Sequence, residues 1–267
     1  MNTLERKMVT LLLELKEKHN VVGVKAEFEA EGTRIEEAMR LKEVSLKAGL
    51  ELALKIGGCE AIRDMFEASD LGTRWLVAPM VETPYALKKY LVALKTGFSL
   101  EQRDDIDFLI NLETITACGN FDAMLALPEI DLLDGIVLGR VDLTGSMNLS
   151  REAINTGEIL QICLEMAAKA KAHGKKVVVG GGVSAHSLPF FRSFPAGHLD
   201  RFETRKVVFS CPEALDNKEE AFLKAVEFEL LWLKNKKAYY SLISLEDDAR
   251  LKMMEDRYRK AIDSVLG

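Results

Sequence analysis

Short apolar runs alternate along the chain with longer segments whose apolar residues recur at helical spacing. Seven runs have the length and β-branched content of strands, and helical segments separate them. This order is typical of a parallel sheet covered by helices, so the pattern predicts an α/β fold. The predicted strands are residues 21–29, 50–57, 74–81, 106–113, 134–139, 175–181 and 205–210. The predicted helices are residues 3–19, 34–48, 59–70, 84–95, 115–127, 156–173 and 186–194.

Residues 218–266 predict two further helices with large apolar faces. Such faces are more than a lone surface helix needs, so we expect them to cover the rest of the domain or a neighbouring subunit. No Gly/Ser-rich linker divides the chain, which predicts one domain over residues 1–267 with residues 218–267 as a helical extension. The apolar faces include Phe222, Leu230, Leu231, Trp232, Tyr239 and Tyr240.

The charge balance argues against two classes of partner. A formal net charge of −6 offers little counterion release on nucleic acid or on an anionic membrane. The four cysteines are scattered and form no CxxC pair, so neither a disulfide framework nor a zinc knuckle is indicated. With no signal-like start and no apolar stretch of about 20 residues, we expect a cytoplasmic protein with a small-molecule substrate.

A length of 267 residues suits a single (β/α) barrel, in which functional groups lie at the carboxyl ends of the strands. The predicted strand ends are rich in acids. Carboxylates gathered in a concave site repel one another, and Mg²⁺ or Mn²⁺ is the simplest way to keep them ionised. The alternative is that these acids pair with Lys and Arg on the rim. The residues at the strand ends are Glu27, Glu29, Lys55, Glu82, Asn111, Glu113, Arg140, Asp142 and Gly180 to Gly182.

The three glycines at 180–182 leave two interpretations open. A glycine run lets the backbone approach a ligand closely, and a helix start after it would favour a phosphate. The same run is equally typical of a tight turn without a ligand, which is the interpretation that we favour.

Three segments, LVAPMVETPYAL, FLINLETITACGNFDAML and DGIVLGRVDLTGSM, resemble consecutive strand ends of the HpcH/HpaI aldolase and citrate lyase family, within the pyruvate-binding TIM barrel superfamily. The similarity runs over about residues 21–182 and implies a TIM-type (β/α) barrel. It further implies that Glu113 and Asp142 bind Mg²⁺ or Mn²⁺. The backbone of Gly139, Arg140 and Val141 would receive the carboxylate of a 2-oxo acid.

Other positions depart from the family pattern. Asn111 stands where the family usually has Gln, and is expected to contact the substrate with a shorter reach. Lys55 replaces a catalytic Arg, so it supplies positive charge without a two-donor fork. Ala30 replaces a catalytic His, which leaves the general base open between Glu29, Glu82 and a metal-bound water.

The chain also begins with a helix where family members begin with a strand. Seven strands are evident, so the first strand is missing or atypical. Either the barrel is incomplete, or residues 238–245 fill the gap.

By this resemblance the chain is a carbon–carbon lyase, a class II pyruvate-type aldolase that acts on a 2-oxo acid through a metal-bound enolate. Two alternatives stay open: a citrate-lyase-like enzyme acting on an acyl-CoA or a 3-hydroxy acid, and a catalytically silent barrel that binds an oxo acid. The apolar C-terminal helices and the family habit predict a homo-oligomer, a trimer or hexamer.

Overall fold

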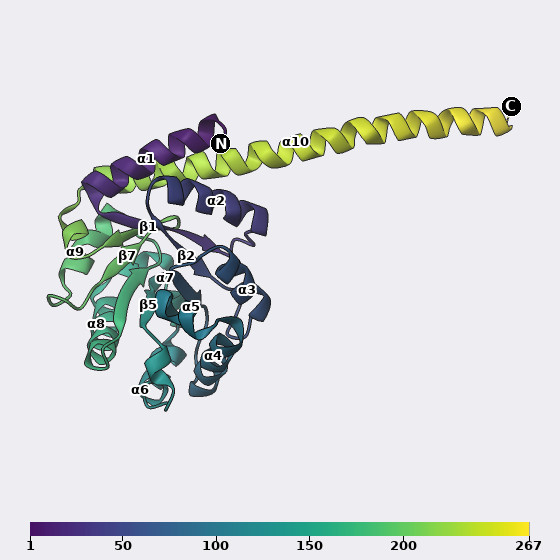
Figure 1. Ribbon diagram of the computed structural model, residues 1–267. Coiled ribbons are helices and arrows are strands. Elements are labelled where there is room, and N and C mark those ends of the chain that lie inside the picture. The colour runs from purple at the N-terminus through teal and green to yellow at the C-terminus, as the bar shows by residue number, and fades with distance from the viewer. Residues whose placement is uncertain (267) are drawn as a thin grey trace.

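The computed structural model describes the backbone of residues 1–266 and the side chains of residues 1–262. Eight strands close into a barrel in chain order (Figure 1). Neighbouring strands from β1 to β7 are parallel, whereas β8 runs antiparallel to both β7 and β1. The strands are β1 (Val21–Glu27), β2 (Glu51–Lys55), β3 (Trp75–Ala78), β4 (Asp107–Leu112), β5 (Gly135–Gly139), β6 (Lys176–Gly180), β7 (Arg201–Glu203) and β8 (Val207–Ser210).

Helices surround this barrel and begin where the sequence offers capping groups. Asn2 and Glu5 form a reciprocal capping box at the first helix, and Thr83 caps the fourth with Pro84 in its first turn. The helices are α1 (Thr3–His19), α2 (Ile35–Lys47), α3 (Ile62–Asp70), α4 (Pro84–Gly97), α5 (Leu100–Asp105), α6 (Ile115–Leu125), α7 (Arg140–Ser146), α8 (Gly157–Ala172), α9 (Leu188–Arg192) and α10 (Glu219–Leu266). Short 3-10 turns follow at Ile130–Leu132, Arg151–Asn155, Ala185–Ser187 and Glu213–Asp216.

Two buried layers hold the barrel together. Side chains that alternate along the strands point inward and form a small cluster that fills the barrel. The opposite faces of the strands pack against the helices in a much larger layer. The inner cluster consists of Ala53, Trp75, Val77, Leu109, Val137, Val178 and Val208.

The predicted barrel is confirmed, with two corrections. All seven predicted strands are present, and Arg201–Glu203 adds an eighth, so the barrel is closed. Residues 238–245 do not fill a gap in it, because they lie within α10. The two predicted C-terminal helices are one continuous helix of 48 residues, since neither Gly nor Pro interrupts it. Gly267, the last residue of the predicted domain, lies outside the described residues.

The first part of α10 binds to the barrel and the last part leaves it. Phe222 stacks on Phe202 of β7 and Phe209 of β8, and the following turns lie along α1. Figure 1 shows the remainder of α10 projecting away from the barrel as a single rod. Within the described residues, no helix combines the length and apolar character that a membrane crossing requires.

Candidate active site

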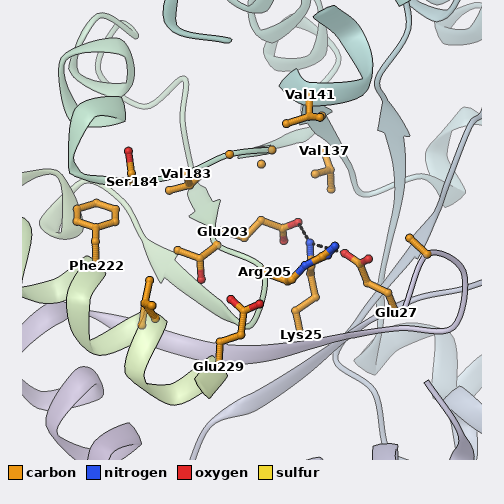
Figure 2. A pocket seen from close by; sticks show the side chains of 18 of the residues that line it. Lys25, Glu27, Val137, Val141, Val183, Ser184, Glu203, Arg205, Phe222 and Glu229 are labelled. Atoms are coloured by element: carbon orange, nitrogen blue, oxygen red, sulfur yellow. Dashed lines mark hydrogen bonds and ion pairs between the residues drawn. The ribbon is translucent and has the colours of Figure 1, made fainter. Parts of the chain in front are cut away.

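A cavity of about 650 Å³ opens at the carboxyl ends of the parallel strands. The strand ends of β1, β2, β4, β5, β6 and β7 contribute side chains or bare backbone to it, and α10 forms part of its wall. Figure 2 shows Phe222 and Glu229 of α10 facing Val137 and Val141 across this space. The cavity therefore lies where the sequence predicts the functional groups of a (β/α) barrel.

Glu113 is the most buried acid of this cavity, with 2% of the residue exposed. It follows β4 directly and precedes Thr114, which caps α6. Its Oε1 accepts a hydrogen bond from the Met80 backbone N–H at 2.9 Å, and its Oε2 accepts from Asn111 Nδ2 at 2.6 Å. Burial raises the pKa of the Glu113 carboxyl despite the opposing effect of Lys55, and the negative charge of Asp142 raises it further.

Lys55 lies between two acids at the end of β2. Its Nζ is 3.0 Å from Glu29 Oε2 and 3.8 Å from Glu113 Oε2. Burial alone would lower the pKa of Lys55, but the Glu113 and Glu29 carboxylates hold it above its ordinary value. The ammonium therefore remains charged and supplies a fixed positive charge beside Glu113.

The backbone segment predicted to receive the substrate carboxylate lies where β5 passes into α7. Gly139 ends the strand, and Val141 and Asp142 in the first turn of α7 line the cavity. Gly181 has φ of 81°, and a Cβ atom there would lie 2.7 Å from the Val141 nitrogen and 2.8 Å from the Arg140 nitrogen. Only a glycine lets this loop lie so close to the first N–H groups of α7.

The Arg140 side chain is fully buried and lines no part of the cavity. Its guanidinium donates to the carbonyls of Gly180 and Gly181 and to Asn155 Oδ1, at 3.1, 2.9 and 2.6 Å. Burial lowers the pKa of Arg140 to about 10. Only the backbone of Arg140 can therefore contribute to binding the substrate carboxylate. The Arg140 side chain instead joins the loop at Gly180 and Gly181 to α7.

Glu82 lies outside the cavity, unlike the other predicted acids. The chain turns at Met80, whose φ is 52°, and the Glu82 carboxylate accepts a hydrogen bond from Thr114 Oγ1 at 2.6 Å. The structure thus leaves Glu82 at the start of α6 and the Arg140 side chain outside the cavity. It brings together the predicted side chains of Glu27, Glu29, Lys55, Asn111, Glu113 and Asp142.

The cavity residues that the sequence reasoning missed include three charged side chains that lie together, Lys25, Glu203 and Arg205. Lys25 Nζ lies 2.7 Å from Glu203 Oε1 and 3.0 Å from Glu27 Oε1. Figure 2 shows the Lys25 side chain between those of Glu203 and Glu27. Burial alone would lower the pKa of Lys25, but these two carboxylates raise it. Lys25 and Glu27 alternate on one face of β1, and this alternation, with Glu29 two residues beyond, was the signal that could have found the lysine.

Comparisons with known proteins agree with this geometry. No family model matches the chain. A curated 2-keto-3-deoxy-L-rhamnonate aldolase of Klebsiella pneumoniae is 25% identical over 128 residues, covering 40% of this chain and 46% of the relative. The match thus spans less than half the length of that relative.

Solved structures give the fold independently. An HpcH/HpaI aldolase/citrate lyase family protein of Burkholderia cenocepacia has a TM-score of 0.60 at 14% identity, covering 86% of this chain and 90% of that one. An HpcH/HpaI aldolase of Desulfitobacterium hafniense has a TM-score of 0.56 at 13% identity, with 69% and 77% covered. The chain resembles the HpcH/HpaI aldolases in sequence and in fold. The resemblance predicted from the strand-end motifs is therefore confirmed.

Proposed function

We propose that this chain is a carbon–carbon lyase of the class II pyruvate aldolase type, acting on a small 2-oxo acid with Mg²⁺ or Mn²⁺. The observation that carries the proposal is the convergence of Glu113 and Asp142 on one cavity, beside Lys55 and Asn111. Lys55, the pair Asn111 and Glu113, and Asp142 come from three separate βα units, so the fold brings them together.

The two acids fit a hard divalent cation. Both are oxygen donors that line the same cavity, and the Asp142 charge contributes to the raised pKa of Glu113. In the described chain no group of three or more His, Cys, Asp or Glu could hold a metal ion. Mg²⁺ commonly uses one or two protein carboxylates and completes its shell with water and substrate, so two acids are sufficient. Such a cation, when bound, would polarise the 2-oxo group of the substrate.

The residues around Glu113 and Asp142 have separate proposed roles in binding and catalysis. The N–H groups of Val141 and Asp142 lie in the first helical turn, where they have no carbonyl partner within the helix, and they would bind the substrate carboxylate. The Lys55 ammonium would stabilise negative charge on the substrate oxygen as a methyl proton is removed. Asn111, which holds Glu113 Oε2 at 2.6 Å, fixes that carboxylate in place.

Glu29 is the proposed general base. It lines the cavity, and one of its oxygens lies 3.0 Å from Lys55 Nζ, whereas Glu82 faces Thr114 outside the cavity. The carboxylate of Glu29 would accept the proton from the methyl carbon and return it to the product.

Deuterium exchange of the pyruvate methyl protons, followed by NMR with and without Mg²⁺ or Mn²⁺, tests the proposal. Wild type and Glu82→Gln should exchange in a metal-dependent way, and Glu113→Gln should be slower by at least about 100-fold. Glu82→Gln is the matched control, because it removes an equivalent acid outside the cavity. Exchange that needs no metal, or that survives Glu113→Gln, would reject the proposed function. Binding of pyruvate in a thermal-shift assay without any exchange would indicate a silent barrel.

A further inference from the structure

The projecting part of α10 carries a stripe of mostly apolar residues along one side, and Leu242, Leu245 and Met253 are exposed on the opposite side. Every described side chain from residue 241 to residue 262 is exposed, including Leu251 at 63% and Tyr258 at 71%. A helix standing alone in water gains no stability from packing, so an exposed rod with apolar side chains would be stabilised by a partner. The face consists of Ile243, Asp247, Leu251, Met254, Tyr258 and Ile262, at intervals of three or four residues that keep them on one side of a helix.

The residues of this face have the same spacing in both directions. The intervals are 4, 4, 3, 4 and 4 residues, so the sequence of spacings reads identically from either end. Reversal places Ile243 opposite Ile262 and Leu251 opposite Met254. It also places Asp247 opposite Tyr258, whose hydroxyl can donate to the carboxylate. A face of this kind is complementary to an antiparallel copy of itself, which is the requirement for an interface with twofold symmetry.

The charged residues on both sides of this face also favour an antiparallel pair. One flank carries Asp248, Lys252, Glu255 and Arg259, and the other carries Glu246, Arg250 and Arg257. In the antiparallel register, Asp248 lies near Arg259 of the second copy, and Lys252 lies near Glu255. On the other flank Glu246 lies near Arg257.

A parallel pair would instead place Asp247 of one copy against Asp247 of the other within the interface, acid against acid. Arg250 is the exception in the antiparallel pair, because it meets no acid across the interface. The charges therefore favour one orientation over the other.

We propose that residues 241–262 of α10 pair with the same segment of a second copy of this chain, as an antiparallel helix dimer. The paired segment is about 30 Å long at the rise of an α-helix. Because the rod leaves the barrel before this segment begins, two barrels fit at opposite ends of the pair (Figure 1). The contact is independent of the proposed catalytic function, and a twofold contact of this kind is compatible with a hexamer and not with a trimer alone.

Charge reversal of the full-length chain tests the pairing by sedimentation velocity. An acidic variant, Arg257→Glu with Arg259→Glu, and a basic variant, Glu246→Arg with Asp248→Arg, should each halve the mass of the wild-type assembly. An equimolar mixture of the two variants should restore that mass, since acids then face bases in both halves of the pair. Arg250→Ala is the control, and it should keep the wild-type mass.

Disulfide crosslinking tests the direction of the pair. Ile243→Cys and Ile262→Cys chains, mixed and oxidised, should give the mixed disulfide as the main product, identified by mass spectrometry of the peptides. A wild type that is monomeric at micromolar concentration would overturn the proposal. So would an assembly that ignores both charge reversals, or crosslinks that join position 262 to position 262. Circular dichroism of each variant verifies that the barrel remains folded.

Discussion

The Glu113 carboxylate occupies space that a side chain at Gly139 would fill. A Cβ atom at Gly139 would lie 2.7 Å from Glu113 Cβ and 2.9 Å from Glu113 Oε2, both closer than side-chain atoms approach in folded proteins. The absence of a side chain at the end of β5 thus allows the acid at the end of β4 to point into the cavity. The position of the proposed metal ligand depends on a glycine from the neighbouring strand.

Gly139→Ala should therefore displace Glu113 and slow metal-dependent pyruvate exchange by about 100-fold. It should also destabilise the fold by about 1–3 kcal/mol, because the neighbouring strands must move to accept the methyl group. Gly119→Ala on α6 is the matched control: a Cβ there meets no atom within 4 Å, so the change should stabilise the helix by about 0.5–1 kcal/mol. Urea unfolding and the exchange rate measure both effects. Wild-type exchange in Gly139→Ala would show that the position of Glu113 is not critical.

The charge of Lys55 leads to a second prediction. Lys55→Met removes the cation that lies 3.0 Å from Glu29 and 3.8 Å from Glu113, and should lower kcat by about 100-fold, with a smaller change in KM. Lys55→Arg should recover most of the rate, because a guanidinium keeps the positive charge and adds a two-donor fork. Steady-state kinetics on a cleavable 2-oxo acid measure both variants. Equal rates for Met and Arg at this position would remove Lys55 from the mechanism.

The barrel could be predicted from the sequence because its strands are continuous apolar runs. The strand β7 was missed since Arg201–Glu203 is three residues long and contains a single apolar residue, Phe202. The reversed direction of β8 could not be predicted either, because an apolar run reads the same whether a strand is parallel or antiparallel. Pairing with β1 and β7 decides its direction.

The candidate site could also be predicted only in part from the sequence. Lys55, Asn111 and Glu113 follow from the rule that functional groups lie at strand ends, and all three line the cavity. Glu82 also follows a predicted strand, but the turn at Met80 leads it to Thr114 instead. The sequence around it gives no sign of that turn, since a methionine rarely adopts a positive φ.

We expect the Arg140 side chain to stabilise the fold, so its removal should lower the free energy of unfolding. Arg140→Met leaves the carbonyls of Gly180 and Gly181 buried without their donor, which should lower the free energy of unfolding by about 3 kcal/mol. Arg63→Met is the control, because Arg63 pairs with Glu67 on the surface of α3 and its loss should cost less than about 0.5 kcal/mol. Urea unfolding compares the two variants. Similar midpoints for both would mean that the guanidinium does not hold the glycine loop.

The ion pairs of Lys25 with Glu27 and Glu203 predict how the free energy of unfolding depends on pH. Burial alone would raise the pKa of Glu27, but Lys25 outweighs that effect and holds it below the ordinary value of 4.5. The unfolded chain therefore binds the proton more readily, so this contribution to stability is present above pH 4.5 and is lost as the pH falls through the lower folded value. Lys25 is shifted in the opposite sense, and its contribution is complete below pH 10.5 and lost only at more alkaline pH.

Acid unfolding tests this prediction. The free energy of unfolding of wild type, measured by urea titration at a series of pH values, should fall as the pH drops below 4.5, and Glu27→Gln should show a shallower fall. At neutral pH the same variant should be less stable than wild type, because Lys25 keeps only Glu203 as a close partner. Glu101→Gln, at an exposed position on α5, is the control and should keep the wild-type slope. A Glu27→Gln profile parallel to that of wild type would mean that Glu27 titrates alike in the folded and unfolded chain, and that Lys25 does not hold it ionised.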